Sequence, residues 1–235
     1  MKTDPGRLAT LTTAVSVVVV LLLLAVLLYQ RSQGHLPLGS PANVVLHTLT
    51  SGQKPLWGLA NSLYGVYFLL LLPAIWVTYR AAKEDHPTEA TLAFGAGFIA
   101  LVTESLGRWW HAIVELPIVN AYQATDNPAA QRSLAELLAR FDAYHQPLHL
   151  GGYAIVVWAV FMLILSLHRK SLPLWSGFLA FAMVPALGPF PPAGLLWAVP
   201  SVWFIGGGFK GSSERAGAGS RRKGGKAPAL ARSRR

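Results

Sequence analysis

Several apolar runs in this chain are long enough to cross a lipid bilayer as helices. The longest uninterrupted run, Leu8 to Tyr29, contains the sequence VVVVLLLLAVLL. A helix needs about 20 apolar residues to cross the hydrocarbon core, where its backbone polar groups must be bonded within the protein. A signal peptide would have a shorter apolar core and a small-residue cleavage site. We therefore interpret this run as an uncleaved first span.

The later runs predict an all-α, polytopic membrane helix bundle that forms one domain, residues 1–209. The expected spans are about 8–29, 57–79, 91–117, 148–167, 172–187 and 190–206. Prolines punctuate the last two runs, so one re-entrant hairpin in place of two spans is left open. Residues 210–235 are rich in Gly, Ser, Arg and Lys, which predicts a disordered tail.

One segment between the spans has a different pattern. Asn127 and Pro128 are typical of a helix start, with an asparagine cap and a proline in the first turn. Apolar residues then recur at helical spacing among charged ones, as far as about residue 143. This segment, residues 128–143, is too short and too charged to span a membrane. We expect an amphipathic helix in the interface or over the mouth of the bundle.

Charge predicts the orientation of the bundle. The net charge is +10, but nine of the 20 Lys and Arg residues follow position 209, so charge gives no support to nucleic-acid binding. With six spans, 15 basic residues fall on one side of the membrane and four on the other. The positive-inside rule then predicts a protein of the plasma (inner) membrane with both termini in the cytoplasm. The basic tail could contact anionic lipid there.

The third span carries a stripe of ionisable side chains, Glu104, Arg108, His111 and Glu115. At about 100° per residue, their spacing keeps all four within an arc of roughly 60°. Such a stripe cannot face lipid, and it must face protein or water. With the predicted orientation, it lies in the extracytoplasmic half of the span.

Polar residues from two other segments are expected at the same end of the bundle. They are Asn61 and Tyr64 near the start of the second span, and Asp142, His145 and His149 before the fourth. Together with the stripe they form a candidate polar pocket.

Four interpretations of this cluster remain open. Its side chains could pair to fix helix packing, Glu104 with Arg108 and Glu115 with Arg108 or His111. They could bind a small molecule, lipid or ion, or they could relay protons. His111, His145 and His149, with a carboxylate, could bind zinc or non-haem iron, although no extended metal-binding motif is present. Because the chain has no cysteine, thiolate metal sites and disulfides are excluded.

Two stretches carry a resemblance, AAQRSLAELLARFDAYHQPLHLGGYAIVVWAV and LHRKSLPLWSGFLAF. Their order, over about residues 120–205, resembles that of bacterial multi-pass membrane proteins defined by a domain of unknown function. The resemblance implies about six helices and no assigned activity. From the candidate polar pocket we expect a membrane protein that binds or senses a small molecule or lipid. The alternative is a metal-dependent membrane hydrolase or oxidoreductase.

Overall fold

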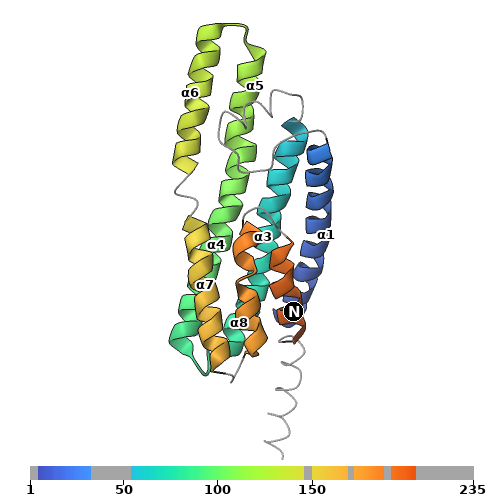
Figure 1. Cartoon of the computed structure of the whole chain (residues 1–235), viewed down its shortest axis with the longest axis vertical. Helices are drawn as coiled ribbons and strands as arrows, with labels where there is room; N and C mark the ends of the chain where they lie inside the picture. The colour runs from blue at the N-terminus through green and yellow to red at the C-terminus, as the bar shows by residue number, and fades with distance from the viewer. Residues whose placement is uncertain (1–4, 33–53, 146–149, 169–171, 188–191, 205–235) are drawn as a thin grey trace, which may run out of the picture.

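The computed structural model describes residues 5–32, 54–145, 150–168, 172–187 and 192–204, and in these ranges all regular secondary structure is helical (Figure 1). The helices are α1 (Pro5–Ser32), α3 (Lys54–Ala82), α4 (Pro87–Trp110), the π-helical segment η1 (His111–Glu115), α5 (Leu116–Ala124), α6 (Pro128–His145), α7 (Leu150–Leu167), α8 (Leu174–Ala180), α9 (Met183–Leu187) and a last helix, Ala193–Phe204. The predicted all-α fold is confirmed.

Four helical stretches are long and apolar enough to cross a membrane, and they match the first four predicted spans. They are Gly6–Gln30, Leu56–Ala82, Pro87–Ala124 and Leu150–Leu167. The last two predicted spans correspond to shorter apolar helices, Leu174–Leu187 and Ala193–Phe204. The chain is therefore multi-pass by its four long candidate spans, and a total of six spans stays a prediction.

The third span is longer than expected. α4, η1 and α5 form one continuous helix of 38 residues, Pro87–Ala124. At 1.5 Å per residue it is about 57 Å long, whereas the hydrocarbon core of a bilayer is about 30 Å thick. In Figure 1, α5 and α6 project together beyond the other helices. The helix thus continues past Pro117, where the sequence predicts its end.

The amphipathic helix lies along the molecule rather than across it. α6 begins as predicted, because the side-chain oxygen of Asn127 accepts a hydrogen bond from the backbone N–H of Ala129 at 3.0 Å. It then runs back beside α5, parallel to the long axis of the bundle (Figure 1). Its apolar face explains this direction, because Leu138 packs with Trp57 and Val119 in a small hydrophobic cluster. Part of the apolar face of α6 thus packs against protein, and its predicted place in the membrane interface or over the bundle mouth stays a prediction.

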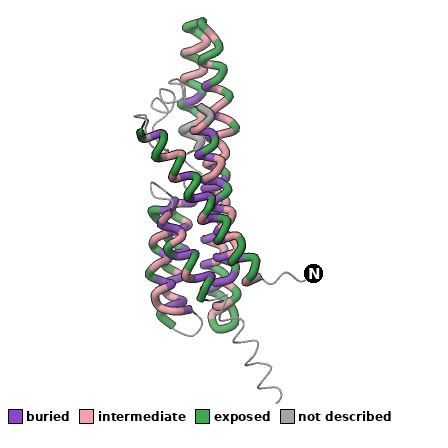
Figure 2. The backbone as a smooth tube through the Cα atoms, turned by 90° about the vertical axis from the view of Figure 1, so that its right-hand side faces the viewer, coloured by how far each residue is buried: buried purple, intermediate pink, exposed green. Residues whose placement is uncertain are grey.

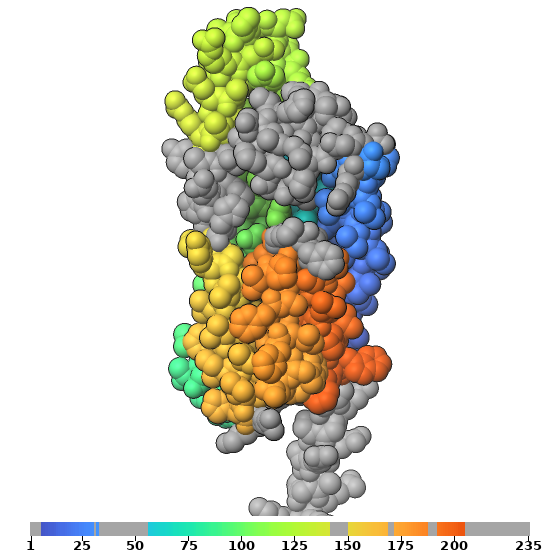
Figure 3. Space-filling view, viewed as in Figure 1, coloured from blue at the N-terminus to red at the C-terminus, as the bar shows by residue number. Residues whose placement is uncertain are grey.

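α3 occupies the centre of the described bundle. It packs between α1 and α4, while α4 also packs against α7, and α7 against α8. On the face shown in Figure 3, α7, α8 and the last helix lie side by side. Buried residues are concentrated where the helices meet, and the far end of the α5–α6 hairpin is mostly exposed (Figure 2). Several apolar side chains point outward, such as Trp203 at 83% exposure.

Small residues bring α4 and α7 into close contact. A Cβ atom added to Gly97 would lie 2.6 Å from Cδ1 of Trp158 and 2.9 Å from Cδ1 of Ile75. Trp158 is fully buried, and its ring packs edge-on against that of Trp197 at a centroid distance of 4.7 Å. Gly97 therefore makes the close helix contact expected of small residues in membranes. Gly95, two residues earlier, has open space around its Cα.

We expect Gly97→Ala to destabilise the bundle, because the new methyl group overlaps a tryptophan ring that is held on its other side. Overpacking of this kind costs about 1–3 kcal/mol, which exceeds the gain in helix propensity of up to about 1 kcal/mol. Thermal unfolding in detergent measures the effect. Gly95→Ala is the matched control and should unfold at the same temperature as the wild type or higher. Equal unfolding temperatures for the two variants would contradict the packing described here.

Candidate functional site

α3 and α4 run antiparallel, and two hydrogen bonds fix their register. The Ser105 hydroxyl donates to the carbonyl oxygen of Gly65 at 2.9 Å, and the Trp109 indole N–H donates to that of Ser62 at 3.4 Å. At the end of α4 that leads into α5, Gly58 of α3 faces Leu116. This register places Asn61 and Tyr64 of α3 beside the part of α4 that carries the ionisable stripe.

The stripe faces the interior of the bundle, as predicted. Glu104, His111 and Glu115 are buried, and Arg108 is half-buried. The opposite side of the same helix is open, because Ile113 is 70% exposed. The 3.6-residue period therefore identified the correct face of the helix.

Arg108 connects three segments of the chain. Its guanidinium carbon lies 4.4 Å from the centroid of the Tyr64 ring, within the range of a cation–π interaction. Its Nη2 also donates a hydrogen bond to the carbonyl oxygen of Leu187 at 3.1 Å. Leu187 is the last residue of α9, where helix carbonyls lack intrahelical partners and the helix dipole favours positive charge. Arg108 thus caps a helix that ends beside the polar stripe.

Glu104 lies against the first turn of α7. A Cβ atom added to Gly151 would lie 2.8 Å from Cγ of Glu104 and 2.9 Å from its Oε1. The amino end of a helix favours a neighbouring carboxylate, because its first N–H groups lack intrahelical partners. The predicted pairing of Glu104 with Arg108 is not observed, since no ion pair within 4 Å joins these two described residues.

His111 and Glu115 form the second part of the site. The Nδ1 atom of His111 lies 2.7 Å from Oε2 of Glu115, and both side chains are buried. The sequence left open whether Glu115 pairs with Arg108 or with His111, and in the structure it pairs with His111. The His111 ring also makes an edge-on contact with the Trp57 ring of α3, at a centroid distance of 5.5 Å.

The same five residues, His111–Glu115, form a π-helical turn. The backbone N–H of Leu116 bonds to the carbonyl oxygen of His111, one residue further back than in an α-helix. Pro117 gives a physical reason, because it has no N–H to donate to residue 113 and its ring crowds that carbonyl. The wider turn lets the helix continue through the proline. π-Helical turns are frequent at functional sites, and no pattern in the sequence predicted this one.

Asn61 lies between the two parts of the site. On α3 it is four residues after Trp57 and three before Tyr64, so the three side chains share one face. Its Nδ2 donates to the backbone carbonyl oxygen of Trp57 at 3.1 Å, and the side chain is 1% exposed. Two buried oxygens here have no hydrogen-bond partner, Oδ1 of Asn61 and Oε1 of Glu115. Native structures rarely leave such atoms unsatisfied.

The remaining predicted site residues lie at the end of α6 and just after it, outside the described side chains. His149 lies outside the described residues, as do the side chains of Asp142 and His145 at the end of α6. Among the described residues, no group of three or more His, Asp or Glu side chains could hold a metal ion. The metal site proposed from His111, His145 and His149 needs two of these undescribed side chains, so it stays a prediction.

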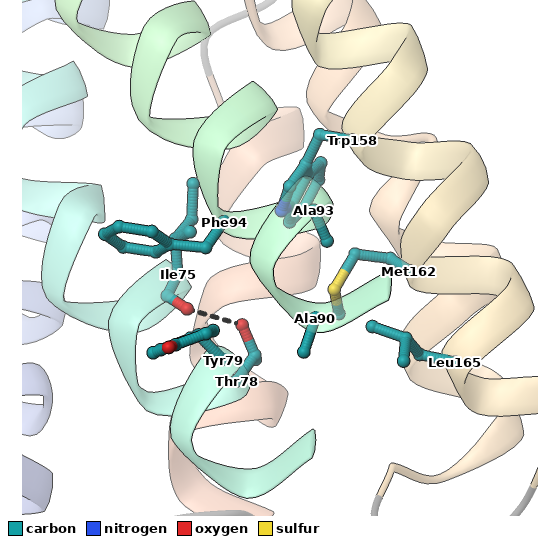
Figure 4. A pocket seen from close by; sticks show the side chains of 9 residues that line it. All are labelled: Ile75, Thr78, Tyr79, Ala90, Ala93, Phe94, Trp158, Met162 and Leu165. Carbon is teal, nitrogen blue, oxygen red and sulfur yellow. Dashed lines mark hydrogen bonds between the residues drawn. The ribbon is translucent and has the colours of Figure 1, made fainter. Parts of the chain in front are cut away.

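A small cavity lies elsewhere in the bundle, between the first turns of α4 and parts of α3 and α7. It has room for about one water molecule. Its lining includes Trp158, Met162 and Thr78, whose hydroxyl donates to the carbonyl oxygen of Ile75 at 2.7 Å (Figure 4). This cavity is too small for an organic ligand, and it is well separated along α4 from the polar stripe.

No protein-family model, curated protein or solved structure matches this chain. The resemblance to bacterial membrane proteins of unknown function therefore stays a prediction.

We expect Arg108→Met to weaken the attachment of α9 to α4. The substitution leaves the Leu187 carbonyl without its donor, and an unsatisfied buried acceptor costs about 1–3 kcal/mol. Thermal unfolding in detergent should shift to lower temperature, and hydrogen exchange across α9 should accelerate. Arg132→Met, on an exposed position of α6, is the matched control and should change neither. If both variants behave like the wild type, Arg108 does not cap α9.

Proposed function

We propose that this protein binds or senses a small molecule or a lipid at the polar site between α3 and α4. The observation that carries the proposal is the pair of unpartnered oxygens, Oδ1 of Asn61 and Oε1 of Glu115. Arg108 and His111, which lie in the same cluster, both have partners. The two oxygens are therefore acceptors that a bound molecule with hydrogen-bond donors would satisfy. Ionisable residues within a membrane span are a functional-site hypothesis by default, because burying them there is costly.

We further propose that the site opens toward the extracytoplasmic side of the plasma membrane. The excess of basic residues in the other connections and in the tail supports this orientation. In Figure 1 the N-terminal end of α1 lies at the opposite end of the molecule from the α5–α6 hairpin. In this orientation the hairpin extends from the extracytoplasmic surface, close to the buried site. The last two apolar helices then cross the membrane as a short pair.

The test is to identify what copurifies with the protein. The full chain is purified in a mild detergent, and bound molecules are extracted and identified by mass spectrometry. We expect one class of small molecule or lipid in near-stoichiometric amount, and its loss from Asn61→Leu, which removes the unpartnered oxygen at similar volume. Glu136→Gln, at an exposed position of α6, should retain it. Identical extracts from the wild type and Asn61→Leu would refute a ligand at this site.

A further inference from the structure

The two unpartnered atoms of the site have the same chemical character. Oε1 of Glu115 and Oδ1 of Asn61 are both hydrogen-bond acceptors. The other polar atoms of these side chains are occupied, since Nδ2 of Asn61 donates to the Trp57 carbonyl and Oε2 of Glu115 pairs with His111. A complementary ligand must therefore bring hydrogen-bond donors, and it needs no acceptor for these two residues.

The charge of the cluster favours a cationic donor. Glu104 and Glu115 contribute two carboxylates, and Arg108 contributes one positive charge that is held by Tyr64 and Leu187. The Glu115 carboxylate has His111 on Oε2 and no partner on Oε1. Buried charges are stable when they are paired, and hydrogen bonds between charged partners are the strong ones. A cationic donor at Oε1 of Glu115 would complete the pairing of this carboxylate.

The neighbouring aromatic ring agrees with this assignment. Trp57 contacts His111, which pairs with Glu115, and Asn61 lies one turn from Trp57 on the same face of α3. An ammonium group at Oε1 of Glu115 would lie beside the imidazole that the Trp57 ring contacts, and tryptophan is the best aromatic partner for a cation. Tyr64, the next aromatic residue on that face, already holds Arg108.

We propose that Glu115 and Asn61 bind a primary ammonium group, from either a phosphoethanolamine lipid headgroup or a free small amine. This inference rests on the proposed ligand-binding function and specifies its ligand class. A primary ammonium has three N–H donors, enough to satisfy both oxygens, whereas a quaternary ammonium such as choline has none. The phosphoethanolamine and phosphocholine headgroups carry the same charge, but only the first has N–H donors. Comparing their binding therefore separates hydrogen bonding from charge attraction alone.

The experiment measures lipid binding to the full chain in delipidated detergent micelles by native mass spectrometry. The probes are phosphatidylethanolamine and phosphatidylcholine with identical acyl chains, each with and without free ethanolamine. We expect phosphatidylethanolamine to bind at least about tenfold more tightly. Glu115→Gln and, independently, Asn61→Leu should abolish this preference, whereas Glu136→Gln should retain it. If free ethanolamine displaces phosphatidylethanolamine, the ligand is a small amine. If free ethanolamine does not displace it, the ligand is the lipid headgroup.

Two results would overturn the inference, and they have different consequences. Equal binding of the two lipids that is lost in Asn61→Leu would refute ammonium recognition, while the proposed binding site would stand. If neither lipid nor ethanolamine binds, and nothing copurifies that Asn61→Leu loses, both proposals fail. The unpartnered oxygens would then be satisfied by water.

Discussion

A membrane helix that carries two carboxylates, a guanidinium and an imidazole on one face is stable only when other helices enclose that face. The hydrocarbon core offers no water to these groups, so each must find a partner within the protein. In this protein α4 packs between α3 and α7, and η1, which carries His111 and Glu115, packs against α3. Gly151 allows α7 to approach Glu104, and the register of α3 supplies Trp57, Asn61 and Tyr64.

The same requirement explains why short helices are tolerated inside the bundle. α9 ends at Leu187, and its last carbonyl groups would be costly in an apolar environment. Arg108 supplies a donor and a positive charge at that point, so the helix end and the buried guanidinium satisfy one another. Most of the polar stripe is thus internally paired, which makes the unpartnered oxygens of Asn61 and Glu115 the exception that requires an explanation.

Periodic features could be predicted from the sequence, and features that depend on distant contacts could not. Four spans and the inward direction of Glu104, Arg108, His111 and Glu115 follow from apolar run length and helical spacing. Asn61 and Tyr64 are three residues apart, so helical spacing also places them on one face of α3. By contrast, the role of Leu187 as the partner of Arg108 depends on a contact 79 residues apart. The direction of α6 depends on the packing of Leu138 with Trp57 and Val119, which no local pattern encodes.

The polar stripe of α4 and η1 faces α3, and cysteine cross-linking tests this most directly. The chain has no native cysteine, so an introduced pair reacts without background. In membranes treated with a short bifunctional thiol reagent, the pair Trp57→Cys and His111→Cys should cross-link rapidly. The pair Trp57→Cys and Ile113→Cys should not, because Ile113 lies on the exposed side of the helix. Faster cross-linking at position 113 than at 111 would contradict the enclosed site and the functions proposed for it.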